Sequence, residues 1–271
     1  MNALAQPVAR YQRSDGRIEI VVAERGGRAS LRRAYQAGSG KVRLLRPATD
    51  AVEALVLNTA GGLAGGDRFH LSAAVTGRPL ILSTQASERV YRAEGGRARV
   101  EQHLSVGAGG RLVHAPQPTI LFNDASLARR TRIDIAGDGA LTFVEGLVMG
   151  RAAMGETVRS VDLADRTDLR IDGRLAFVDA LRLGTAQLAD MAMPAMLGGH
   201  RAAGLVLHRD GDLAAARDKL LAVLPETAGA SLVGGVMVAR ILAPTHGALQ
   251  DSLARALTAL TGAPPPRSWQ I

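Results

Sequence analysis

The feature that most constrains the fold of this chain is a series of short segments in which apolar and polar residues alternate. Residues 68–76 are the clearest case, with Phe69, Leu71 and Val75 on one face and mostly polar residues on the other. A period of two is typical of a strand with one buried face. Similar segments recur along the chain, separated by glycine-containing turns. The pattern predicts a mainly β fold, with many short strands in packed, locally connected sheets.

The predicted strands cover residues 18–23, 29–35, 42–45, 54–59, 68–76, 79–84, 97–106, 111–114, 132–136, 141–149 and 169–171, with a strand pair or one long strand at 230–242. Gly137-Asp138-Gly139 and Asp172-Gly173 predict hairpins, and Gly26-Gly27 predicts a turn. Residues 141–149 are apolar on both faces, which indicates a strand buried on both sides. Residues 115–122 contain two prolines, so we expect an extended, irregular segment there.

Two helices are predicted towards the C-terminus. The first begins after Asp212, a good N-cap, and Pro225 stops it. The second begins near Thr245 and ends at Gly262. The Met-rich segment Thr185–Leu197 is a candidate for a third helix. No linker divides the chain, so residues 1–271 are expected to form a single domain with a Pro-rich tail at 262–271.

Composition limits the classes of function. The 271 residues contain no cysteine, which excludes disulfides, thiolate metal sites and cysteine nucleophiles. The uncharged runs are shorter than the ~20 residues that a membrane span requires, and no signal-peptide pattern precedes them, so a cytoplasmic protein is expected. Residues 1–50 carry ten basic and four acidic side chains, or +6 of the total net charge of +8. An acidic protein partner accounts for this charge, and so does plain solubility. Nucleic acid is a third explanation, although aromatic residues for base stacking are few.

A glycine-rich loop follows the predicted strand at 54–59. Gly61-Gly62 and Gly65-Gly66 enclose two residues, and Asp67 comes directly after them. The loop fits neither a P-loop nor a dinucleotide-binding pattern, since it carries no Gly-Lys-Ser/Thr and is followed by a strand. It is therefore interpreted either as a tight connection between two strands or as a surface that another protein approaches closely.

Glu145 is the most informative single residue, because it interrupts an apolar strand face. A buried carboxylate must be paired, hydrogen-bonded or protonated. Two interpretations stay open: an ion pair with an arginine such as Arg151, or a role in guiding a partner or a cation. None of the standard catalytic motifs occurs, and the six histidines are scattered, so each is interpreted first as structural.

Several longer motifs resemble the urease accessory protein family UreD, also called UreH. They are NTAGGLAGGD at 58–67, TQAS with VYR at 84–92, PQPTILF at 116–122, EGLVMGRAAMGE at 145–156 and PRSW at 266–269. The resemblance implies a mainly β maturation factor without catalytic activity. It also implies binding to apo-urease and, with UreF and the GTPase UreG, help in delivering nickel to the urease active site.

The resemblance also suggests which residues matter. The motif and interaction residues it implies are Asn58, Gly61, Gly62, Gly65, Gly66, Asp67, Thr84, Gln85, Tyr91, Arg92, Glu145, Gly150, Arg151, Met154, Gly155 and Glu156. Candidates for transient nickel contact are Asp67, His70, His114 and Glu145. Nickel is expected in transit, with no tightly bound cofactor and neither nucleic acid nor membrane as a partner. A β-rich hydrolase or carbohydrate-active protein and an Arg-rich nucleic-acid-binding protein are the alternatives.

Overall fold

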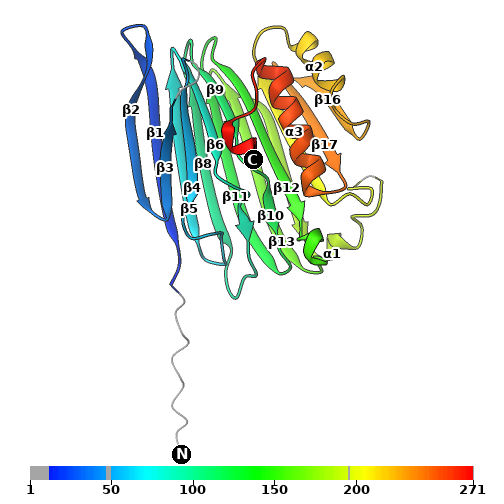
Figure 1. The fold of residues 1–271 in the computed structure, drawn as a ribbon. Coiled ribbons are helices and arrows are strands. Elements are labelled where there is room, and N and C mark those ends of the chain that lie inside the picture. Colours follow the sequence, from blue (N-terminus) through cyan, green and yellow to red (C-terminus); the bar gives the residue numbers. More distant parts are fainter. Residues whose placement is uncertain (1–11, 47–49, 195, 271) are drawn as a thin grey trace, which may run out of the picture.

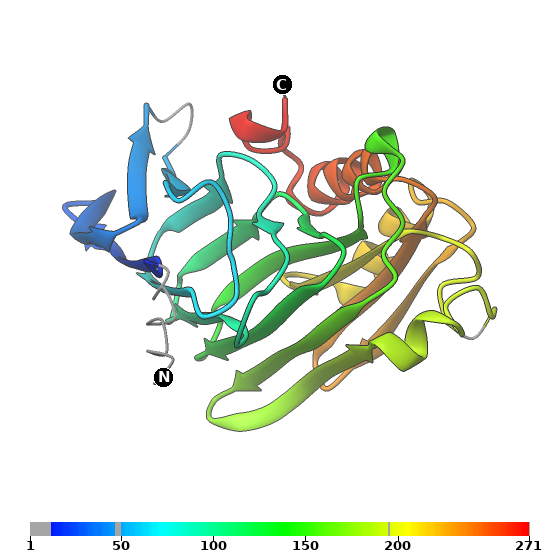
Figure 2. The same cartoon turned by 90° about the horizontal axis from the view of Figure 1, so that it is seen from below.

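The structure, a computed structural model, describes residues 12–46, 50–194 and 196–270, and its main feature is a pair of facing β-sheets (Figures 1 and 2). The seven-stranded sheet has the order β14 (Arg174–Gly184), β13 (Val161–Ile171), β11 (Ala125–Ile135), β8 (Ala98–Val106), β5 (Arg68–Thr76), β1 (Asp15–Arg25), β2 (Arg28–Gly38). The ten-stranded sheet has the order β16 (Ala228–Val233), β17 (Val236–Ala243), β15 (Ala202–Arg209), β12 (Ala140–Met149), β9 (Arg111–Ala115), β6 (Pro79–Thr84), β4 (Val52–Asn58), β3 (Gly40–Leu45). Its two remaining strands are β10 (Thr119–Leu121) and β7 (Arg89–Val90), which pair with each other beside β12. The mainly β prediction is confirmed.

Between β4 and β13 the chain passes repeatedly from one sheet to the other. β5, β8, β11 and β13 pair in parallel in the seven-stranded sheet, while β4, β6, β9 and β12 pair in parallel in the ten-stranded sheet. The predicted turn at Gly26-Gly27 and the predicted hairpin at Asp172-Gly173 join antiparallel neighbours and are confirmed.

The hairpin predicted at Gly137-Asp138-Gly139 is wrong. This turn leads from β11 in one sheet to β12 in the other. A Cβ atom on Gly139 would lie 3.0 Å from the carbonyl oxygen of Val106 and 3.1 Å from that of Gly107. The absence of a side chain at Gly139 therefore allows two successive sheet-to-sheet connections to pack closely. This close packing explains the glycine without a hairpin.

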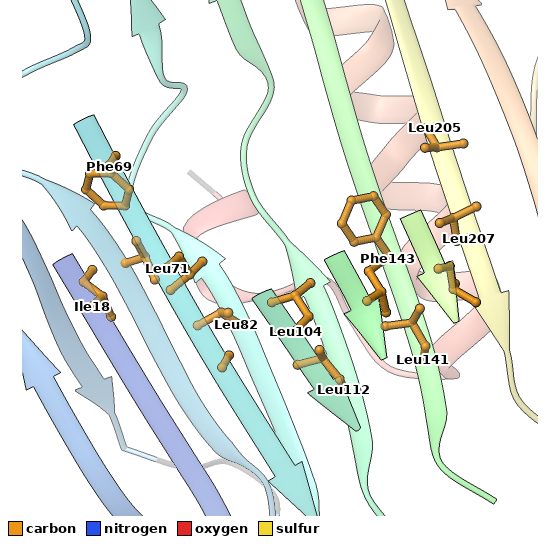
Figure 3. Packing of buried hydrophobic residues seen from close by; sticks show 14 of the residues in the cluster. Ile18, Phe69, Leu71, Leu82, Leu104, Leu112, Leu141, Phe143, Leu205 and Leu207 are labelled. Carbon is orange, nitrogen blue, oxygen red and sulfur yellow. The ribbon is translucent and has the colours of Figure 1, made fainter. Parts of the chain in front are cut away.

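The inner faces of the sheets form an aliphatic core. Ile18, Leu71 and Leu104 of the seven-stranded sheet face Leu82, Leu112 and Phe143 of the other, and all six are buried (Figure 3). These residues occupy alternate positions of their strands, so the apolar face predicted from the period of two is the one that lies inside.

A second core lies on the outer face of the ten-stranded sheet, beneath α3 (His246–Thr261). Val144 and Val148 of β12 belong to it together with Leu249 and Leu253 of the helix. Phe143 belongs to the core between the sheets. The prediction that residues 141–149 are buried on both sides is therefore confirmed.

Helix boundaries follow their capping residues. Thr245 caps α3 by accepting a hydrogen bond from the Ala248 amide, and Gly262 ends it in a left-handed conformation with φ of 68°. Asp212 caps α2 (Leu213–Leu221) through the amides of Ala214 and Ala215. None of the helices in the described ranges is long and apolar enough to cross a membrane.

Three segments differ in detail from their predictions. α2 ends at Leu221, before Pro225. In the Met-rich segment the helix α1 covers only Thr185–Leu188. Leu188 and Met191 are only partly buried against the core, which gives a longer helix little stabilisation. Residues 115–122 are extended as predicted but include the short strand β10, and the 3-10 helices η1 (Ala152–Met154) and η2 (Arg267–Trp269) complete the elements.

Candidate functional site

The glycine-rich loop connects β4 to β5 and is fixed by side chains at both ends. The carboxylate of Asp67 accepts hydrogen bonds from the amides of Ser14 at 2.8 Å and Ala64 at 2.7 Å. The amide nitrogen of Asn58 donates to the carbonyl oxygen of Gly62 at 3.1 Å. Asp67 is buried and its oxygens bind backbone amides, so the structure gives it a role in shaping the loop.

Tyr91 and Gly62 bring the loop against the segment that follows β7. The Tyr91 hydroxyl donates to the carbonyl oxygen of Gly61 at 3.0 Å. A Cβ atom on Gly62 would lie 2.3 Å from Cε2 of Tyr91, and its φ of 152° is one that other residues rarely adopt. Gly65 is equally confined, because its Cβ would lie 2.7 Å from the carbonyl oxygens of Gly95 and Gly96.

Several motif residues that are distant in the sequence lie together next to this loop. The ring of Tyr91 packs edge-on against Phe122, with 5.1 Å between ring centroids, and the guanidinium of Arg151 lies 4.2 Å from the Phe122 centroid. Nε of Arg151 pairs with Glu156 at 2.8 Å, which holds the pKa of that carboxyl below its usual range. Met154 is 74% exposed beside them.

The remaining motif residues lie around the same cluster. Arg92 lies 3.9 Å from Asp124 and is largely exposed. Gly150 and Gly155 adopt left-handed conformations at the two ends of the short turn that carries Met154. The structure thus brings the motifs at 58–67, 84–92, 116–122 and 145–156 together at one end of the sandwich.

A cavity of about 280 Å³ lies between the two sheets. Leu71, Leu82 and Phe69 supply part of its apolar wall (Figure 3). Its polar lining residues are Asn58, Ser83, Thr84, Gln85, Ser87, Glu88, Arg89, Gln102, His114, Gln117, Thr119 and Arg129. Gln85 and Arg89 are exposed, which places the mouth of the cavity next to the glycine-rich loop.

His114 lines the cavity in an unusual state. It is 2% exposed, its ring stacks on Phe143 with 5.2 Å between centroids, and neither ring nitrogen has a hydrogen-bond partner among the described residues. Burial, together with the nearby Arg129 guanidinium, lowers the pKa of His114 to about 3. The ring is therefore neutral at physiological pH. Ser83, which also lines the cavity, has a buried hydroxyl without a partner in the same ranges.

Arg129 closes the inner end of the cavity within a buried charge cluster. Its Nε and Nη2 atoms donate to Asp165 at 3.0 and 2.5 Å, and its Nη1 atom lies 2.9 Å from Oε1 of Glu145. That oxygen accepts no hydrogen bond within the described part of the chain, so charge holds this pair. Burial raises the pKa of Glu145, and the attraction of Arg129 counteracts it.

The interpretation of Glu145 as the partner of an arginine in an ion pair is confirmed, but Arg151, the arginine suggested as an example, is not that partner. Glu145 is paired with an arginine, but the arginine is Arg129 of β11, while Arg151 binds Glu156. Arg151 lies close to Glu145 in the sequence, but the strand direction carries it to the end of the sandwich. Arg129 occupies an inward position between buried Leu127 and Thr131. A charged residue at an inward position of a strand is the sequence signal that could have identified Arg129 as a partner of Glu145.

The four candidates for nickel contact are not gathered in one place. His114 lines the cavity and Glu145 lies behind Arg129, while Asp67 belongs to the loop and His70 lies 3.8 Å from Glu101. No group of three or more metal-binding side chains occurs among the residues that the structure describes.

Glu88 lines the cavity as well, although it is not among the predicted site residues. Asn58 donates to its carboxylate at 3.3 and 3.4 Å. Burial raises the pKa of Glu88 to about 7, although the hydrogen bond from Asn58 opposes this shift. The carboxyl group therefore changes its charge near neutral pH. Its position within the motif at 84–92 was the available signal.

Comparisons with known proteins identify the family of this chain. The model of the family described as UreD urease accessory protein matches residues 14–270. A urease accessory protein UreD of Methylobacterium sp. (strain 4-46) is 40% identical, covering 96% of both chains. UreD of Ruegeria pomeroyi is 40% identical over 94% of this chain and 100% of its own length, and UreD 3 of Methylorubrum extorquens is 42% identical over 98% and 93%. The chain therefore belongs to the UreD urease accessory protein family.

Proposed function

We propose that this protein binds apo-urease and, together with UreF and the GTPase UreG, assists the insertion of nickel into the urease active site. Membership of the UreD family and relatives that carry the name urease accessory protein support the urease part of the proposal. Part of the motif set supports a binding role, because its exposed or half-buried residues gather beside the glycine-rich loop: Tyr91, Arg92, Arg151, Met154 and Glu156.

The observation that carries the nickel part is the state of His114. A buried polar group without a partner costs about 1–3 kcal/mol, so its presence calls for a function or a ligand. Its neutral imidazole keeps a lone pair free for a metal ion, and imidazole is a suitable ligand for Ni(II). Ser83 adds a hydroxyl oxygen to the same cavity.

The properties of Glu88 fit a nickel ion in transit better than one that is stored. With a pKa of about 7, its carboxyl group exchanges a proton for a cation near neutral pH. Together His114 and Glu88 offer nickel few ligands, and a cargo ion that must leave again requires weak binding. We therefore propose these two residues as transient contacts for nickel, the protein's cargo.

The charge cluster behind the cavity extends beyond the Arg129 guanidinium, which closes the inner end of the cavity. It continues from Arg129, Glu145 and Asp165 to Asp179, which pairs with Arg240 at 2.6 Å. The cluster contains three carboxyl groups and two guanidinium groups, and burial raises the pKa of Glu145, so its net charge lies between −1 and 0. Asp179 of β14 and Arg240 of β17 are partly exposed, so the cluster extends towards the side of the sandwich where the edge strands β14 and β16 lie.

Co-expression tests the proposal. The tagged full chain is produced with the urease subunits, alone and with UreF and UreG, and both the retained proteins and the urease activity are measured. We expect apo-urease and UreF to co-purify, and we expect urease activity to require this chain. Absence of both partners from the purified material, or full urease activity without the chain, would overturn the proposal.

A further inference from the structure

The outer face of the seven-stranded sheet is open among the described residues. Helix α3 packs on β12, β15 and β17, and α2 packs on β16 and β17, all of them strands of the other sheet. Figures 1 and 2 show both helices on that side of the sandwich. An open sheet face presents its outward side chains to any protein that binds there.

Arginines dominate that face across β8, β11, β13 and β14. We call arginine face the outward residues Arg99, Arg130, Arg132, Arg166, Arg170 and Arg182. Strand register aligns them: Arg130 lies opposite Arg166, Arg132 opposite Asp168, and Arg182 opposite Ala164.

Most of the carboxylates on the same strands are already engaged. Asp162 binds Arg97, Asp134 binds His103 at 2.8 Å, and Asp168 binds two arginines. By contrast, Arg132, Arg170 and Arg182 make no ion pair with any residue that the structure describes. The face therefore carries positive charge that the chain itself does not neutralise.

Asp168 fixes two of the arginines in position. It is buried beneath them and accepts from Nη2 of Arg130 at 3.0 Å and from Nε of Arg166 at 2.8 Å. These bonds hold the pKa of Asp168 below its usual range. Because the two guanidinium groups are already ordered, a partner that binds them loses less side-chain entropy than it would with free arginines.

Exposed apolar side chains lie beside these arginines. Val178 of β14 is opposite Asp168 and is 37% exposed, and Leu175 is opposite Arg170 and is 55% exposed. Arginine is enriched at the centre of protein interfaces, and the exposed aliphatic groups add apolar area that a partner can remove from water. The face carries no aromatic residue on these four strands' outward positions, so base stacking on nucleic acid is not favoured.

We propose that the arginine face, with Leu175 and Val178, is a docking surface for a protein whose facing surface is acidic. The inference rests on the proposed function, since it assumes that this partner is one of the three proteins named there. The inference specifies the face of the sandwich that binds the partner and the sign of the charge on the partner's surface. The cavity mouth and the glycine-rich loop are not part of it.

A charge-reversed variant tests the surface. Arg132→Glu with Arg182→Glu changes two exposed arginines that form no ion pair within the described ranges, so the fold is expected to persist. The matched control is Lys219→Glu with Arg255→Glu, which makes the same change of charge on α2 and α3. Apo-urease, UreF and UreG are each titrated against parent, variant and control, at low and at high salt.

We expect one of the three proteins to bind the parent and the control alike and to bind the variant at least ~10-fold more weakly, with a smaller salt dependence. Leu175→Ser with Val178→Ser, which leaves all charges unchanged, should also weaken binding of that protein. Equal binding by parent, both variants and control would overturn the docking surface and leave the proposed function standing. A parent that binds none of the three would overturn both. Binding of duplex DNA that depends on Arg132 and Arg182 would assign the face to nucleic acid instead.

Discussion

At the scale of single residues, the buried charge cluster depends on Arg129, which pairs with two carboxylates. It is the one guanidinium in contact with both Glu145 and Asp165 among the described residues, and all three side chains are buried. Such a cluster is stable only while every charge keeps its partner. Sequence neighbours do not reveal this balance, because the three residues come from three different strands of two sheets.

Removing Arg129 should destabilise the fold strongly. Arg129→Met keeps an extended side chain but leaves two buried carboxylates without a cation. We expect the free energy of unfolding to fall by about 3–5 kcal/mol, measured by urea denaturation. Arg130→Met is the matched control: its side chain is 48% exposed, and Asp168 keeps Arg166, so a loss below about 1 kcal/mol is expected. Equal losses for both variants would contradict the buried cluster.

His114 should make stability depend on pH in a defined direction. Its pKa is lowered from 6.5 to about 3 in the folded chain, so between these values the unfolded chain binds a proton that the folded chain does not. This term therefore destabilises the fold as the pH falls through that window, by about 1.4 kcal/mol per pH unit. His114→Leu removes the term.

Urea denaturation of parent and His114→Leu between neutral and mildly acidic pH checks the prediction. The variant should equal or exceed the parent in stability at pH 7, because it removes a buried polar group without a partner. Its advantage should widen as the pH falls. Parallel curves for parent and variant would show that His114 is not held neutral by burial.

At the scale of elements, the connection between β4 and β5 depends on two neighbouring glycines in different ways. Gly61 has a φ of 75° with open space around its Cβ position, whereas Gly62 combines a φ of 152° with a Cβ position 2.3 Å from the Tyr91 ring. Gly61→Ala should cost about 1–2 kcal/mol from backbone strain alone. Gly62→Ala should cost more, because a clash with Tyr91 is added to the strain.

Thermal melting of the two alanine variants separates these causes. The Gly62→Ala variant should also weaken the assembly with apo-urease and UreF, since it displaces Tyr91 and the arginine stacked beyond Phe122. If both variants melt together and assemble like the parent, the loop is only a flexible connection.

The elements themselves were largely predictable from the sequence. Alternation predicts most of the strands, because burial of one face imposes it, and Thr245 and Gly262 define the ends of α3. The largely exposed β14 and the almost wholly buried β15 lack a one-sided burial pattern, and neither strand is predicted. Alternation does not show which strands pair with each other. The turn at Gly137–Gly139 therefore looks like a hairpin in the sequence, although it connects the two sheets. The cavity could not be predicted from the sequence, for the same reason. Ser83 and His114 both line it because β6 and β9 are parallel neighbours, and Glu88 joins them because the segment after β6 also lines the cavity.

At the scale of the whole molecule, the two sheets divide the surface into regions with different properties. The ten-stranded sheet is covered by α3 and by the C-terminal segment, where Nε1 of Trp269 donates to the carbonyl oxygen of Ala115 at 2.9 Å. The arginine face is open, and the cavity reaches the surface at the end where the motifs gather. We infer that partner proteins bind the outer surface of the sandwich and that nickel enters the cavity between the sheets.

The direct test of this account is nickel transfer by the His114→Leu variant. The protein is assembled with apo-urease, UreF and UreG, nickel and GTP are supplied, and nickel bound per urease active site is measured together with the composition of the complex. The matched control is His208→Leu, since His208 is also buried, with its pKa lowered to about 4 by burial, but it bonds to Thr142 and does not line the cavity. We predict that His114→Leu forms the complex normally and transfers much less nickel than the control does per folded chain. Nickel transfer at the parental level by His114→Leu would contradict the account.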